Sequence, residues 1–176
     1  IILMASRLTA EKNIALAIEA MKRVVKIHPK TGLIIVGEGP KEENLKSQIS
    51  NLKIHENIMI ESWTDDLISY YKTADLFLLT SNFEGYGRTV VEAMAAGCPV
   101  IMTDVGLAGE VLIDKKDGLV VPVGDKKKLA EVILKLIENL ELKAELVRNS
   151  QKTMNFWLTK EAYLSAYRES WTLCGK

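Results

Sequence analysis

Several features that mark specialised classes of protein are scarce in this chain of 176 residues or missing from it. It has only two cysteines, Cys98 and Cys174, and they lie far apart, so we expect a reducing compartment, with the cytoplasm as the default, and no disulfide framework. No stretch approaches the roughly 18 apolar residues that a membrane-spanning helix needs. The 23 basic and 23 acidic residues cancel, and the lysines are dispersed, which argues against a nucleic-acid partner.

What is present is the composition of an ordinary globular domain. Apolar residues make up 48% of the chain and charged residues 26%, which excludes a disordered or collagen-like chain. The length fits one domain, so we expect residues 1–176 to form it, with 151–176 as a C-terminal helical extension. The chain opens on the strand-like run Ile1–Ala5, which suggests a piece of a longer protein.

Short apolar runs alternate with amphipathic segments. The runs lack period-2 alternation, as is typical of strands buried on both faces, and they lie at 1–5, 32–37, 58–60, 74–79, 99–103 and 118–121. The segments with helical spacing lie at 13–27, 41–52, after 64–66, and at 89–96, 126–140, 141–150 and 159–173. This alternation predicts an α/β fold, a Rossmann-like, doubly wound parallel sheet of about six strands with helices on both faces.

In such a sheet, ligands bind at the carboxyl ends of the strands, so the residues just after each strand are the ones to examine. The loop after the first strand contains Arg7 and Lys12. A guanidinium can bind a phosphate through two hydrogen bonds and an ammonium adds a point charge. These residues therefore predict an anion site, and the alternative is that both are solvated and pair with Glu11.

The loops after the second and third strands carry weaker signals. The turn Gly37-Glu38-Gly39-Pro40 is half of a dinucleotide-binding fingerprint, and a plain tight turn is the alternative. Glycine there lets a ligand approach the backbone closely. Trp63, after the third strand, suits the cover of a nucleobase, and the alternative is that it caps the hydrophobic core.

The loop after the fourth strand is the most informative. Gly85 and Gly87 flank Tyr86 just before a helix that begins near Arg88 or Thr89. Several backbone N–H groups without helical partners therefore point into the crevice at the positive end of a helix, which is an anion site.

Glu92 lies about one turn inside this helix, in an otherwise apolar stretch. A buried carboxylate needs a partner, and the two adjacent hydroxyls of a ribose would supply one. The alternatives are that Glu92 caps a backbone N–H group or pairs with Arg7 or Lys12.

The stretch 84–100, with the sequence EGYGRTVVEAMAAGCPV, resembles the E-x7-E signature of the retaining, family 4 (group 1) nucleotide-sugar glycosyltransferases of the GT-B architecture. Four further elements resemble the C-terminal domain of that family, in order, over about residues 3–140. They are the spacing of Arg7 and Lys12, the GEGP turn at 37–40, Ala74-Asp75 before the fourth strand, and the run DGLVVP at 117–122.

The resemblance implies the donor-binding domain of an enzyme that moves a hexose from a UDP-sugar or GDP-sugar to a glycan, a lipid carrier or a small molecule. It implies that the diphosphate is held by Arg7, Lys12 and backbone amides of the 85–89 turn, and that Glu84 faces the hexose. The donor-binding residues are then Gly37, Trp63, Gly85, Tyr86, Gly87, Arg88, Thr89 and Glu92, and the catalytic ones Arg7, Lys12 and Glu84. No metal and no other cofactor is implied.

Family chemistry retains the anomeric configuration, and in the front-face mechanism proposed for the family the leaving phosphate accepts the acceptor's proton. The charge that develops on the departing diphosphate would be stabilised by Arg7, Lys12 and a helix N-terminus. The acceptor would be held by an N-terminal domain that we expect to be absent from this chain, which would then bind a donor weakly without turning it over.

Two residues depart from the family pattern. Arg88 stands where an aliphatic residue is common, and it either adds a third phosphate cation or points to solvent. Glu61 stands near a common glycine position, which is a departure beside the expected base pocket.

Other functions remain open. One alternative is half of a nucleotide-sugar epimerase, which shares the two-domain architecture, and another is a non-catalytic nucleotide-sugar-binding module. The basic run 126–128 either faces water or, in a full-length protein peripheral to a membrane, lies near anionic lipid.

Overall fold

Six parallel strands form one sheet in the computed structural model, which describes residues 1–155 and 160–174 and the side chains as far as residue 172. The strands are β1 (Ile2–Ala5), β2 (Leu33–Val36), β3 (Ile58–Glu61), β4 (Leu76–Leu79), β5 (Val100–Thr103) and β6 (Leu119–Val121). Their order is β3-β2-β1-β4-β5-β6, so the winding direction reverses between β1 and β4. The predicted α/β, Rossmann-like parallel sheet is confirmed.

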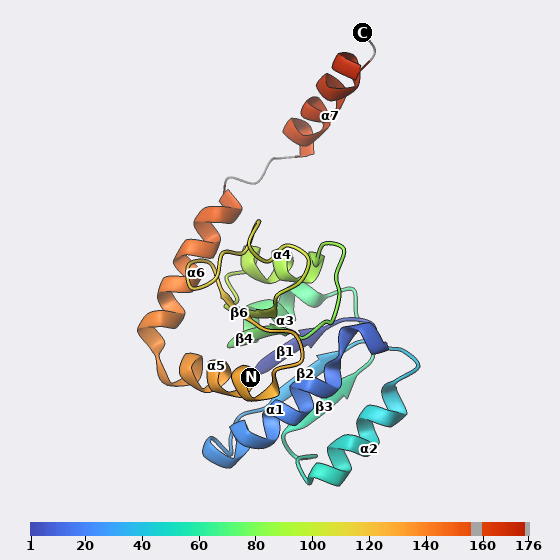
Figure 1. Ribbon diagram of the computed structural model, residues 1–176, viewed down its shortest axis with the longest axis vertical. Coiled ribbons are helices and arrows are strands. Elements are labelled where there is room, and N and C mark those ends of the chain that lie inside the picture. The colour runs from blue at the N-terminus through green and yellow to red at the C-terminus, as the bar shows by residue number, and fades with distance from the viewer. Residues whose placement is uncertain (156–159, 175–176) are drawn as a thin grey trace.

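Helices cover both faces of this sheet (Figure 1). The helices are η1 (Ala10–Lys12), α1 (Ile14–Ile27), α2 (Glu42–Leu52), α3 (Leu67–Thr73), α4 (Arg88–Ala95), α5 (Lys126–Glu138), α6 (Leu140–Asn155) and α7 (Lys160–Cys174). The first core lies under α1, α2 and α5, and the second under α3 and α4. None of the described helices is long and apolar enough to span a membrane.

Each strand supplies both cores because its side chains alternate between the two faces of the sheet. In β1, Ile2 and Met4 join the first core, while Leu3 and Ala5 join the second. This two-sided burial is the physical reason why the strands have no polar face in the sequence.

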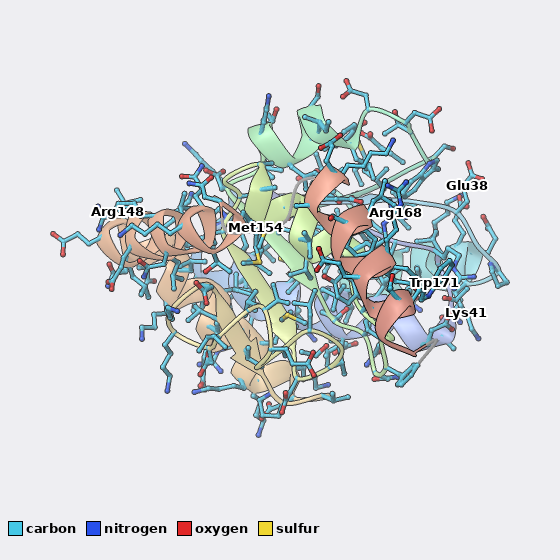
Figure 2. The ribbon with its side chains drawn as sticks, turned by 90° about the horizontal axis from the view of Figure 1, so that it is seen from above. Glu38, Lys41, Arg148, Met154, Arg168 and Trp171 are labelled. Carbon is cyan, nitrogen blue, oxygen red and sulfur yellow. The ribbon has the colours of Figure 1, made fainter. Side chains whose placement is uncertain are left out.

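The C-terminal part begins later than expected. The helix α6 continues to Asn155, and Met154 packs against the second core (Figure 2), so residues 151–155 belong to the body of the domain. The described side chains of α7 are exposed, and this helix stands apart from the sheet (Figure 1). The expected helix 159–173 begins at Lys160, and residue 159 lies outside the described residues.

The cysteines give no sign of reactivity where they are described. Cys98 is buried in the second core, and burial raises the pKa of its thiol to about 12. It is therefore a small core residue, as thiols in apolar surroundings commonly are. The side chain of Cys174 lies outside the described residues.

The loops after β1 and β2 touch each other through backbone atoms. A Cβ atom on Gly37 would lie 1.9 Å from the carbonyl oxygen of Ser6, and one on Gly39 would lie 2.5 Å from that of Leu8. The N–H of Leu8 donates to the carbonyl of Glu38 at 2.8 Å. The close approach at Gly37 and Gly39 is therefore made by the backbone of the loop after β1.

We expect Ile35→Ala to lower the free energy of unfolding by about 2–5 kcal/mol, because Ile35 is fully buried in the first core and its loss leaves a cavity. The neighbouring Ile34→Ala removes the same atoms from a half-buried position on the other face and should cost clearly less. Urea denaturation of both variants measures the difference, and equal losses would contradict the assignment of faces.

We expect Gly37→Ala to destabilise the domain by about 1–3 kcal/mol, since its methyl group would overlap Ser6. The matched substitution Gly85→Ala meets no atom within 4 Å and should change stability by less than about 0.5 kcal/mol. Thermal denaturation without ligand compares the two, and a tolerated Gly37→Ala would show that the loop contact is dispensable.

Candidate functional site

The candidate site lies where the winding direction of the sheet reverses. Strands β1 and β4 are hydrogen-bonded neighbours, and their carboxyl ends lead into the loops 6–13 and 80–87. In open α/β sheets the crevice outside this switch point is the usual position of a ligand.

Hydrogen bonds hold these two loops together. The hydroxyl of Thr80 donates to the backbone carbonyls of Lys12 and Asn13 at 3.1 and 3.0 Å. The backbone N–H of Asn82 donates to the carbonyl of Glu11 at 2.8 Å, and the amides of Asn13 and Asn82 bond at 2.9 Å. The loop after β1 is therefore positioned by the loop after β4.

An ion pair lies at the centre of this junction. Lys12 Nζ is 2.7 Å from Glu84 Oε1, and the hydroxyl of Ser81 donates to the same oxygen at 2.7 Å. The two charged side chains are only 16% and 10% exposed. Lys12 thus pairs with Glu84, and the pairing with Glu92 that the sequence left open does not occur.

Arg7 lies in the same loop but takes no part in this pair. Its side chain is largely exposed, and its guanidinium is 3.8 Å from Glu11 Oε1. The alternative considered from the sequence, a solvated residue beside Glu11, describes the position of Arg7. It does not describe Lys12, which is largely buried.

The turn 85–87 leads directly into α4. Gly87 is the N-cap residue, with φ 100° and ψ 52°, and no side chain caps the helix. The first N–H groups of α4 therefore have no helical acceptor, and they form a positive helix end beside the Lys12–Glu84 pair.

The loop after β5 packs against the turn 85–87, a role that the sequence did not indicate. Leu107 is buried and its N–H donates to the carbonyl of Tyr86 at 3.1 Å. A Cβ atom on Gly106 would lie 2.6 Å from the same carbonyl oxygen. A glycine before a large apolar residue in a polar loop was the available signal.

A cavity of about 770 Å³ opens between α3 and α4. The predicted residues that line it are Trp63, Arg88, Thr89 and Glu92. Trp63 is half exposed and so does not cap the core, which was the alternative for it. Glu61 does not line the cavity, and its carboxylate accepts a hydrogen bond from the hydroxyl of Tyr70.

Glu92 lies on the wall of this cavity, and it is not buried as expected. Its side chain is 38% exposed, and its Oε1 atom is 3.5 Å from the guanidinium of Arg88. Its Oε2 atom accepts a hydrogen bond from the hydroxyl of Tyr71 at 3.1 Å. Tyr71 was not singled out in the sequence, because an aromatic residue at helical spacing is typical of a core.

The structure thus gathers most of the predicted residues in two adjoining parts. Lys12, Glu84 and the turn 85–87 form a positively polarised rim, and the cavity beside α4 offers a tryptophan and a carboxylate. The first part suits an anion and the second suits a planar ring with adjacent hydroxyls. Gly37 lies outside the cavity lining, against Ser6.

Comparison with known proteins identifies the family of this chain. The family model described as glycosyl transferases group 1 matches residues 1–153. Poly(glycerol-phosphate) alpha-glucosyltransferase of Bacillus subtilis (strain 168) is 34% identical over 135 residues, which is 76% of this chain and 20% of that protein.

Two solved structures have the same fold. Staphylococcus aureus TarM, in complex with UDP and other ligands, has a TM-score of 0.89 at 26% identity. The pneumococcal O-GlcNAc transferase GtfA, in complex with UDP and GlcNAc, has a TM-score of 0.85 at 26% identity. Each match covers 96% of this chain and 34% of the other.

This chain therefore spans a fifth to a third of the length of these proteins, and its sheet corresponds to the Rossmann-like, C-terminal portion of their GT-B architecture. The chain belongs to the group 1 glycosyl transferases.

Proposed function

We propose that this chain is the donor-binding domain of a retaining glycosyltransferase that moves a hexose from a UDP-sugar or GDP-sugar to an acceptor. The observation that carries the proposal is the ion pair of Lys12 and Glu84 beside the uncapped start of α4, next to a cavity that contains Glu92. The presence of UDP in the TarM and GtfA structures supports a nucleotide-sugar donor.

In this proposal the diphosphate lies at the N-terminus of α4. Backbone N–H groups of the 85–89 turn donate to the phosphate oxygens, as helix ends commonly do. The ammonium of Lys12 has three N–H donors, of which the bond to Glu84 uses one. Arg7 is exposed at the rim and can turn toward the phosphates without losing a buried contact.

The nucleoside occupies the cavity between α3 and α4. Trp63 covers the base, and Glu92 accepts hydrogen bonds from the ribose hydroxyls. The partial exposure of both side chains supports this role, because a ligand can reach them without a rearrangement of the core. Glu84 faces the hexose while it holds Lys12 in place.

The chemical step then depends on stabilising the leaving group. The bond between the anomeric carbon and the diphosphate oxygen breaks, and the acceptor oxygen bonds to the anomeric carbon on the same face. The acceptor's proton passes to the leaving phosphate. Lys12, Arg7 and the helix dipole stabilise the charge that develops there, and a fixed arrangement of such groups is an effective source of catalysis.

The acceptor is held by a part of the protein beyond these 176 residues. The short span of this chain relative to TarM and GtfA supports that division of labour. The chain by itself then binds the donor weakly without transferring sugar, in the cytoplasm or at the cytoplasmic surface of a membrane.

Calorimetric titration of the chain with UDP, GDP and ADP tests the proposal. We expect saturable binding of UDP or GDP, and no release of free sugar when the matching nucleotide sugar is incubated with the chain. If a folded sample gives no heat with any of the three nucleotides, the donor-binding role is wrong.

We expect Glu92→Ala to weaken UDP binding about ten- to a hundredfold, because each hydrogen bond to a carboxylate contributes about 1.5–3 kcal/mol. Binding of inorganic pyrophosphate should stay unchanged, since it has no ribose. Glu131→Ala, which removes an exposed carboxylate from α5 on the opposite face, is the control. An equal loss for both ligands would rule out the ribose role of Glu92.

A further inference from the structure

The two oxygens of Glu92 have partners of very different kinds. Oε2 accepts a hydrogen bond from Tyr71, at 3.1 Å, and Oε1 is 3.5 Å from the guanidinium of Arg88. The first contact is a hydrogen bond, slightly longer than the usual range of about 2.5–3.0 Å for O–H···O, whereas the second is beyond the usual range for N–H···O. The carboxylate is therefore hydrogen-bonded to the protein through one oxygen, and its other oxygen has only the looser contact with Arg88.

Tyr71 is fixed by the core. Its side chain is 1% exposed, and its ring meets that of Phe77 edge to face, with the ring centres 5.4 Å apart and the planes at 69°. Phe77 is a fully buried residue of the central strand β4. The position of the Tyr71 hydroxyl is thus determined by the packing of α3 on the sheet.

Arg88, the partner of Oε1, is not fixed by the core as Tyr71 is. Its side chain is 84% exposed, and it belongs to the first turn of α4, where a long flexible side chain can swing into solvent at little cost. Its contact with Oε1 is therefore one that a ligand can replace.

The hydroxyl of Tyr71 also has a constant role as a donor. Burial and the adjacent carboxylate of Glu92 both raise the pKa of Tyr71, so its hydroxyl keeps its proton at neutral pH. A neutral phenol next to a carboxylate can only donate to it, and this orients the carboxylate without neutralising it.

We propose that Tyr71 is a positioning residue that holds Oε2 of Glu92, so that Oε1 faces the cavity and receives the hydroxyls of the nucleotide ribose in place of Arg88. This rests on the proposed function, in which Glu92 binds the ribose. Tyr71 lines the cavity but need not touch the ligand, since its effect passes through Glu92.

The test compares Tyr71→Phe with Tyr70→Phe by calorimetry, with UDP and with 2′,3′-dideoxy-UDP as ligands. Tyr70 is the neighbour of Tyr71 in α3, and its hydroxyl also donates to a carboxylate, that of Glu61, which lies outside the cavity lining. Both variants keep the aromatic ring, so the edge-to-face contact with Phe77 is preserved in Tyr71→Phe.

We expect Tyr71→Phe to weaken UDP about tenfold and to leave 2′,3′-dideoxy-UDP unchanged, because the latter has no hydroxyls for Glu92 to bind. Tyr70→Phe should leave the affinity for both ligands unchanged. In the Glu92→Ala background, Tyr71→Phe should cause no further loss.

Other outcomes would contradict the role of Tyr71 or the proposed function. Equal losses for UDP and the dideoxy analogue would mean that Tyr71 only shapes the cavity, and an unchanged affinity for UDP would mean that Glu92 needs no positioning. A wild-type chain that binds UDP and its dideoxy analogue equally would overturn the ribose contact and the role of Tyr71 with it. A folded wild-type chain that binds none of UDP, GDP and ADP would overturn the donor-binding proposal itself, and if it binds GDP alone, the same comparison is made with GDP and its 2′,3′-dideoxy analogue.

Discussion

The ion pair between Lys12 and Glu84 joins the two halves of the sheet at the point where its winding reverses. Each charge is almost buried, and a buried charge without its partner is strongly destabilising, so neither loop can move far without the other. The loop after β1 is thereby held against the loop after β4. The turn 85–87 and the start of α4 follow Glu84 directly in the chain, and Arg7 lies in the same loop as Lys12.

The helix α4 begins at the rim and continues along the wall of the cavity. Its buried face, with Val90, Ala93 and Met94, packs in the second core, and its open face presents the N-terminal amides and then Glu92 one turn later. An anion and a ribose would therefore be bound by a single rigid element. Leu107 donates a hydrogen bond to the turn 85–87, so the loop after β5 contributes to the site without lining the cavity.

The sequence was informative about elements and poor about contacts between them. Apolar runs without alternation predicted all six strands, and the Gly-Tyr-Gly turn predicted a helix that begins near Arg88 or Thr89, where α4 begins at Arg88. The partner of Lys12 could not be found in this way, because Glu84 is 72 residues away and only the strand order brings them together. Tyr71 resembled any core aromatic residue, since only the hydrogen bond to Glu92 distinguishes it. For Gly37 the sequence left a ligand contact and a plain tight turn open, and the carbonyl of Ser6 in front of this glycine favours the turn.

The central claim is that a nucleoside diphosphate binds at the start of α4 and along the cavity beside α3. Titration of the isotope-labelled chain with UDP, followed by the amide and indole signals in NMR spectra, tests it most directly. The account predicts that the largest shifts come from the amides of residues 85–89 and the indole of Trp63. It would be contradicted by shifts confined to the amino ends of the strands, around Thr31 and Leu140, where a second cavity of about 540 Å³ lies.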